Sequence, residues 1–137
     1  MDWKDCVDNK LVKSKSVDKG LIDSLLKTSE MKLESNNRLE LDEVTAATKI
    51  GIAYDSLREM LEALAIKKGF KVYSHECFCA FLDEICRDKS LADEFDKYRK
   101  VRNQVNYYGK SVNAEEAKVL IKGMTSLRSK IKQLLKA

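Results

Sequence analysis

A run of apolar residues at helical spacing occupies the middle of the chain. From about Leu41 to Lys68 these residues recur every three or four positions, which predicts one long amphipathic helix. The positions expected to face the core are Val44, Ala47, Ile50, Ala53, Tyr54, Leu57, Met60, Leu61 and Leu64. A cationic last turn followed by Gly69 and Phe70 is typical of a helix that ends at a glycine with an apolar contact beyond it. The 137 residues contain no proline, which interior helix positions reject, so helices are favoured elsewhere as well.

Four more segments show helical spacing. They cover about residues 16–36, 75–87, 90–108 and 113–136, with predicted N-caps at Ser16, Ser74, Ser90 and Asn113. No segment shows sustained strand alternation, apart from a few residues near Val72. We therefore predict an all-α fold, an up-and-down bundle of four to five helices over residues 16–137, preceded by a polar N-terminal tail of residues 1–15.

The sequence also predicts the cellular compartment of the protein and whether it holds a metal ion or cofactor. No stretch approaches the ~20 apolar residues of a membrane span, and the N-terminus lacks the apolar run of a signal peptide, so we expect a cytoplasmic protein without membrane association. Its four cysteines are then expected to be reduced thiols, buried as small hydrophobes. Three of them lie near His75, but Cys79 and Cys86 are separated by about 10 Å of helix rise and cannot easily share one zinc ion. We expect no metal site and no cofactor.

Positive charge is concentrated in the last third of the chain. Residues 97–137 contain 11 Lys and Arg but only 2 Asp and Glu, whereas the rest contains 15 basic and 20 acidic residues. This asymmetry indicates attraction to a polyanion such as RNA, or to the acidic face of another protein. A solvated lysine-rich face kept for solubility would give the same pattern, so the charge alone leaves both interpretations open.

One arginine lies on the predicted buried face of the helix over residues 90–108. The inner stripe of that helix consists of Leu91, Phe95, Tyr98 and Val105. At 100° per residue, Arg102 lies within about 40° of both Phe95 and Tyr98. Because an unpaired buried charge is costly, Arg102 must reach the rim, pair within a polar pocket or serve a site. Asp55 and Glu59 of the long helix are candidate partners for it.

Residues 95–107, Phe-Asp-Lys-Tyr-Arg-Lys-Val-Arg-Asn-Gln-Val-Asn-Tyr, resemble the signature helix of the HEPN domain family. HEPN domains carry an arginine, often followed by asparagine or another polar residue, and a histidine four to six residues after the arginine. Arg102 and Asn103 match the first part of that motif. The order of the predicted helices is also similar, and the resemblance covers roughly residues 16–136.

The resemblance implies a helical bundle that forms a homodimer, in which the two signature helices meet in a composite cleft. In active members the arginine and histidine cleave RNA without a metal ion. The histidine handles the proton of the ribose hydroxyl or of the leaving oxygen, and the arginine stabilises charge on the phosphate. Other members bind nucleotides, or are partners of small nucleotidyltransferases in toxin–antitoxin pairs. Residues expected near a dimer seam are Tyr54, Tyr98, Arg102, Val105 and Tyr108.

The sequence departs from the active motif at the histidine, where it has Tyr107. A phenol has a pKa of about 10 and is a poor general base at pH 7, but it can donate a hydrogen bond to phosphate or stack on a base. The candidate binding residues are Arg102, Asn103, Asn106, Tyr107, Tyr108 and Lys110. The only histidine, His75, is a candidate catalytic residue together with Arg102 and Tyr107, or a structural residue in the first turn of its helix.

We therefore expect a HEPN-like dimeric module that binds RNA or a nucleotide through a basic cleft around Arg102, with ribonuclease activity reduced or absent. Two alternatives remain open. The first is an active, toxin-like, metal-independent endoribonuclease that uses Arg102 with Tyr107 or His75. The second is the protein-interaction subunit of a nucleotidyltransferase-type toxin–antitoxin pair. The sequence leaves undecided whether the chain is an enzyme.

Overall fold

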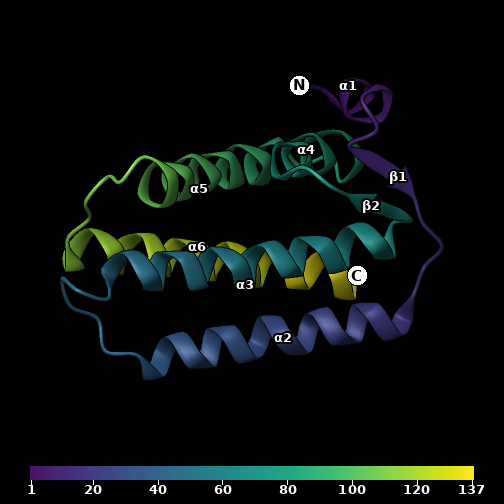
Figure 1. Ribbon diagram of the computed structural model, residues 1–137. Helices are drawn as coiled ribbons and strands as arrows, with labels where there is room; N and C mark the ends of the chain where they lie inside the picture. The colour runs from purple at the N-terminus through teal and green to yellow at the C-terminus, as the bar shows by residue number, and fades with distance from the viewer.

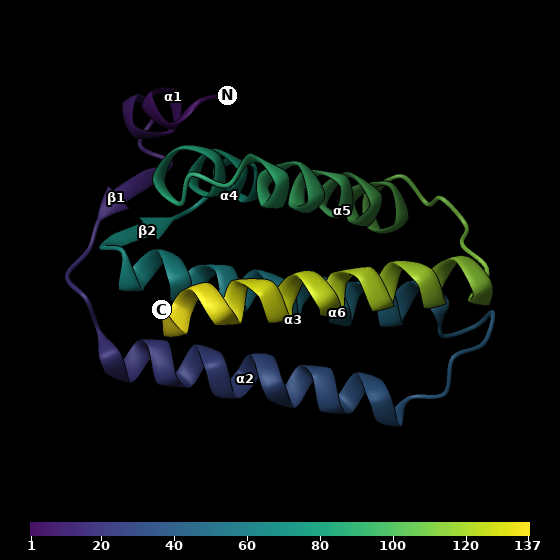
Figure 2. The same cartoon turned by 180° about the vertical axis from the view of Figure 1, so that it is seen from behind.

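The computed structural model describes residues 1–137 and shows helices arranged in three layers (Figures 1 and 2). In chain order the elements are α1 (Trp3–Asp8), β1 (Val12–Ser14), α2 (Lys19–Arg38), α3 (Ala46–Lys67), β2 (Phe70–Val72), α4 (His75–Ala80) with its π-helical continuation η1 (Phe81–Ile85), α5 (Lys89–Tyr107) and α6 (Ala114–Lys136). Helix α2 forms one outer layer, α3 and α6 lie side by side in the middle, and α4 and α5 form the other outer layer. The predicted all-α bundle is confirmed. None of its helices is both long enough and apolar enough to cross a bilayer.

Helix α3 is the centre of the core because it packs against α2, α5 and α6. Its fully buried side chains include Ile50, Tyr54, Leu57, Met60, Leu61 and Leu64. Burying a large apolar side chain contributes about 1.5–3 kcal/mol, so this stripe is a large part of the driving force for folding. The predicted stripe is confirmed from Ile50 onward. Val44 is instead 88% exposed, because α3 begins only at Ala46.

Side-chain caps mark the starts of α1, α2, α5 and α6, whereas α3 and α4 begin without one, so the predicted cap at Ser74 makes no side-chain hydrogen bond. Helix α6 starts with the predicted capping box at Asn113. Two other predicted caps are wrong by two residues, because an aspartate takes the role given to a nearby serine. Asp88 rather than Ser90 caps α5, and Asp18 rather than Ser16 caps α2. Aspartate and serine are about equally good N-caps, so spacing alone does not choose between them.

Residues 1–15 are not a polar tail, which corrects the predicted boundary at residue 16. They form α1 and β1, and β1 pairs antiparallel with β2, with Val12 opposite Val72. The indole of Trp3 packs edge-on against the ring of Phe70, with ring centroids 5.0 Å apart. Its centroid lies 6.1 Å from that of the Phe81 ring. Burying this indole and Val12 attaches the segment to the outer layer that contains α4 (Figure 1).

Cys6 and Cys77 form a disulfide that joins α1 to α4, with Cα atoms 6.0 Å apart. The prediction of four reduced thiols is therefore wrong for this pair. Cys79 and Cys86 are free and half-buried. Burial is the main cause that raises the pKa of Cys79 to about 12, so this thiol is protonated at neutral pH and is a poor nucleophile.

Candidate functional site

Helices α3 and α5 bring two tyrosines and an arginine together. Tyr54 comes from the buried stripe of α3, and Arg102 and Tyr107 come from the last two turns of α5. The guanidinium carbon of Arg102 lies 5.1 Å from the ring centroid of Tyr54 and 5.1 Å from that of Tyr107. Tyr54 is fully buried and Tyr107 is 65% exposed, so Arg102 bridges the core and the surface. Contacts of this kind hold the guanidinium in place without neutralising its charge.

No carboxylate neutralises Arg102, and its Nε is buried without a hydrogen-bond partner. Instead, Oδ1 of Asp55 lies 3.9 Å from Nε of Arg58, and Glu59 forms an ion pair with Lys32. Neither of the predicted carboxylate partners therefore pairs with Arg102. A buried donor left unsatisfied costs about 1–3 kcal/mol. The arrangement can therefore accept an external anion without first breaking an internal ion pair.

His75 begins α4 and contacts the same Tyr54 ring. Its Nδ1 lies 3.1 Å from the Tyr54 hydroxyl oxygen. Burial raises the pKa of Tyr54 above its ordinary value, although Arg102, Arg99 and Arg58 oppose the shift, so the phenol is protonated. The phenol donates to Nδ1 or accepts from Nδ1–H, according to the tautomer of the imidazole. Burial, assisted by Arg58 and Arg102, lowers the pKa of His75 to about 4. The structure therefore places a neutral imidazole and the guanidinium of Arg102 against the same Tyr54 ring within one chain.

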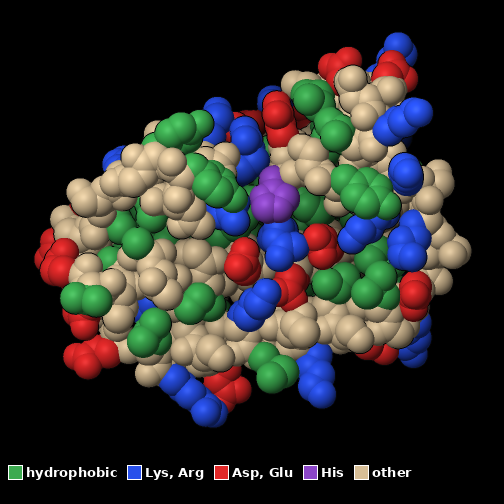
Figure 3. All heavy atoms as spheres, viewed as in Figure 1, with side chains coloured by type: hydrophobic (Ala, Val, Ile, Leu, Met, Phe, Trp, Pro, Cys, Tyr) green, Lys and Arg blue, Asp and Glu red, His purple; other side chains and the backbone are tan.

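Arg58 and Arg99 act electrostatically on His75 and Tyr54, but both are already paired. Arg58 donates to Glu62 at 2.8 Å, and Arg99 donates to Asp96 at 2.7 Å. Figure 3 shows the single histidine at the surface, with basic side chains above and below it and acidic ones close by. Arg102 is thus the arginine of this face that has no carboxylate partner.

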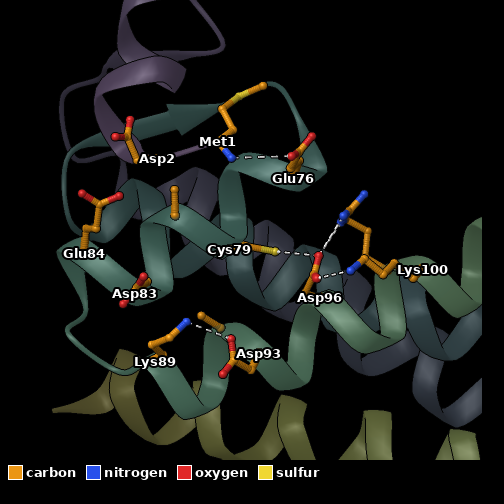
Figure 4. A pocket seen from close by; sticks show the side chains of 13 residues that line it. Met1, Asp2, Glu76, Cys79, Asp83, Glu84, Lys89, Asp93, Asp96 and Lys100 are labelled. Atoms are coloured by element: carbon orange, nitrogen blue, oxygen red, sulfur yellow. Dashed lines mark hydrogen bonds and ion pairs between the residues drawn. The ribbon is translucent and has the colours of Figure 1, made fainter.

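A polar hollow of about 500 Å³ lies on the outer side of α4, η1 and α5 (Figure 4). Its charged side chains largely satisfy one another. Asp96 accepts from Arg99 and Lys100, and the amino group of Met1 lies 4.0 Å from Glu76. Burial alone would raise the pKa of Asp96, but these two hydrogen bonds outweigh it and hold the pKa below its ordinary value. The lining has more acidic than basic side chains, so this hollow, unlike the Arg102 site, does not favour an anion.

The other predicted binding residues do not all gather at Arg102. Asn103 is half-buried, whereas Asn106 and Tyr108 are exposed at the end of α5. Lys110 bends back so that its backbone N–H donates to the carbonyl of Gln104. Its side chain lines a separate hollow of about 380 Å³, whose other lining residues are Val101, Val105, Val112, Glu116, Val119 and Leu120. Lys110 is therefore separated from the Arg102 cluster.

Two residues expected near a dimer seam lie inside the single chain. Tyr54 is fully buried and Tyr98 is 5% exposed. The hydroxyl of Tyr98 faces α6, where it fills the space beside Gly123 that a side chain would need. Neither tyrosine can line a seam without repacking of the core. Both rings fill space between the helices of one chain, so they do not themselves form a seam, and a position near one stays a prediction.

The sequence interpretation missed Arg58 as part of this face. A signal for it was present, because Arg58 is four residues after Tyr54 and so lies one helical turn further along the same side of α3. No group of three or more His, Cys, Asp or Glu side chains is arranged to hold a metal ion. The site is therefore made of arginines, tyrosines and one neutral histidine.

Comparisons with models of protein families, with curated proteins and with solved structures give no match. The functional interpretation therefore depends on the geometry around Arg102 and on the resemblance carried by residues 95–107.

Proposed function

We propose that the chain is a HEPN-like module that binds RNA through the face around Arg102, with ribonuclease activity reduced or absent. The observation that carries the proposal is the guanidinium of Arg102, which lies against two tyrosine rings and has no internal anion. Arginine binds phosphate strongly through charge-assisted hydrogen bonds. The exposed ring of Tyr107 provides a surface on which a neighbouring base can stack.

Fluorescence anisotropy with a labelled single-stranded RNA tests this proposal. Arg102→Ala should weaken binding by about tenfold or more, because a hydrogen bond to a charged group contributes about 1.5–3 kcal/mol. The matched control is Lys97→Ala, which removes the same charge from an exposed position of α5. Lys97→Ala should have little effect. Equal losses in the two variants would contradict a specific site and indicate general attraction between RNA and a basic helix.

A second candidate function is metal-independent RNA cleavage, and the position of His75 favours it. In the tautomer whose Nδ1–H donates to the Tyr54 hydroxyl, Nε2 of His75 is free to accept the proton of a ribose hydroxyl while the guanidinium of Arg102 stabilises the phosphate. However, a pKa of about 4 makes His75 a weak base at neutral pH, so we rank binding first.

Incubation with RNA in EDTA separates binding from cleavage. Cleavage by the wild type that is lost in both Arg102→Ala and His75→Gln would establish a ribonuclease. Tyr107→Phe included in the same series tests the phenol that stands where HEPN nucleases have histidine. Binding without cleavage in every sample would support the binding module.

The same proposal includes a homodimer in the cytoplasm, as expected for a HEPN-like protein. Multi-angle light scattering at micromolar concentration measures the oligomeric state directly. A monomer would remove the composite cleft from the proposal and leave a site within one chain. Thiol alkylation followed by mass measurement would show whether the Cys6–Cys77 bond persists in the reducing conditions of that compartment.

A further inference from the structure

The ribbon formed by β1 and β2 brings like charges together. Its register places Lys13 directly opposite Lys71 in the antiparallel pair. Like charges in this position destabilise a sheet, and three-residue strands have few other contacts to offset the cost. A bound anion between the two ammonium groups would convert the repulsion into attraction.

An exposed tyrosine lies close to both lysines. Tyr73 directly follows β2, where its backbone N–H donates to the carbonyl of Leu11 at 2.8 Å. Its side chain is 57% exposed. The Nζ atoms of Lys13 and Lys71 lie 5.8 Å and 5.9 Å from the ring centroid. The three side chains therefore share one face of the ribbon, with both ammonium groups close to the aromatic ring.

The hollow around this ring contains no acidic side chain. It has a volume of about 330 Å³, and its lining residues are Lys13, Ser14, Lys15, Leu21, Lys71 and Tyr73. Tyr73 is two residues before His75, which contacts the Tyr54 ring that Arg102 also contacts. The hollow therefore adjoins the side of the Arg102 site that His75 forms.

We infer that this hollow is a second subsite for single-stranded RNA, in which a base stacks on Tyr73 and neighbouring phosphates lie against Lys13, Lys15 and Lys71. The inference rests on the proposed function, because it extends the RNA path from Arg102 past His75 onto the ribbon. A positive groove with an exposed aromatic ring is the pattern that single strands use, since their bases are free to stack. Bases in a duplex are already stacked and would leave Tyr73 unused.

The test measures binding of a labelled single-stranded RNA of about 15 nucleotides, which is long enough to reach from Arg102 to the ribbon. Tyr73→Ala should weaken binding roughly five- to hundredfold, the usual effect of removing one stacked base. Tyr73→Phe keeps the ring and should bind like the wild type. Lys13→Gln combined with Lys71→Gln should reduce the slope of log K against log salt by about 1.4, as expected for two lost phosphate contacts on a single strand.

Two controls keep the result interpretable. Lys118→Gln combined with Lys122→Gln removes the same charge from exposed positions of α6 and should leave the salt slope close to that of the wild type. The melting temperature of the Lys13 and Lys71 double variant should be equal to or higher than that of the wild type, because the repelling pair is gone. A loss of binding together with retained stability then reports the subsite and not misfolding.

The outcomes separate this inference from the proposed function. If Arg102→Ala weakens binding and Tyr73→Ala does not, the subsite is wrong and the Arg102 site stands. If Tyr73→Ala weakens binding and Arg102→Ala does not, the ribbon binds RNA and the proposed site is wrong. Equal affinity for a duplex of the same length would overturn the assignment to single strands. Competition by polyglutamate as strong as that by unlabelled RNA would overturn RNA in favour of an acidic protein.

Discussion

Two arginines enter the interior of the bundle, and their surroundings differ completely. Arg128 of α6 is 5% exposed; its Nε donates to the Ser29 hydroxyl at 2.9 Å and its Nη2 to Glu30 at 2.7 Å. Ser29 is further bonded to Ser56, so polar groups of α2, α3 and α6 form one satisfied network. Arg102 of α5 has only aromatic rings against it and keeps an unpartnered Nε.

The difference separates an arginine that stabilises the fold from one that is available to a ligand. Polar groups that satisfy each other hold neighbouring helices in a single arrangement. Arg102 forms no internal ion pair, so an external anion can pair with its half-buried guanidinium without displacing a carboxylate.

Arg128→Ala should lower the free energy of unfolding by about 2–3 kcal/mol, because buried hydrogen bonds to a charged group and the packing of the side chain are lost. Urea unfolding followed by circular dichroism measures the loss. Glu30 is exposed at the surface, so its freed carboxylate returns to water and adds little further cost. RNA affinity should not change. A stability equal to that of the wild type would show that the network does not stabilise the fold.

Gly123→Ala should lower the free energy of unfolding by about 1–3 kcal/mol, since the new methyl group would overlap the hydroxyl of Tyr98 and overpack the contact between α5 and α6. The matched control is Gly51→Ala within α3, where a Cβ would meet only the Asn106 amide at 4.0 Å. The free energy of unfolding of this control should rise by up to about 1 kcal/mol, because alanine has a higher helix propensity than glycine. Thermal unfolding of both variants checks that one is less stable and the other more stable than the wild type. A Gly123→Ala variant more stable than the wild type would show that Tyr98 moves aside easily.

Arg102→Met should change the free energy of unfolding by less than about 1 kcal/mol, because the loss of the cation–π contacts is offset by removal of a buried unsatisfied donor. The same urea titration used for Arg128→Ala gives the comparison directly. A loss as large as that of Arg128→Ala would mean that Arg102 is a structural residue, and would remove the distinction between the two arginines.

His75 should make the fold sensitive to acid. Its pKa is about 4 in the folded chain, against about 6.5 in an unfolded chain. Between these values the unfolded chain binds the proton more readily, so stability falls as the pH drops from about 6.5 to 4, and His75 contributes no pH dependence above that range. The melting temperature of the wild type should therefore fall more steeply over this range than that of His75→Gln. Parallel curves would mean that the imidazole is not shielded from water.

The sequence predicted the features that depend on local spacing. The long helix and the inward direction of Arg102 follow from a period of 3.6 residues, and the glycine end follows from the positive φ that Gly69 accepts. The features it did not predict depend on distant pairing. The strands β1 and β2 have three residues each, too few to show alternation, and their partners are separated by two long helices. The proximity of His75 to Arg102 also depends on how α4 packs on α3, which no local pattern encodes.

The pairing of β1 with β2 also affects the order in which the chain can fold during synthesis. The ribosome releases β1 before α2 and α3, and β2 only after them. The first two long helices are sequence neighbours that pack against each other, so they can form a hairpin early, whereas the ribbon must wait for a partner that is distant in sequence. The hollow lined by Lys13, Lys71 and Tyr73 can therefore form only after the ribosome has synthesised α2 and α3, which separate β1 from β2 in the chain.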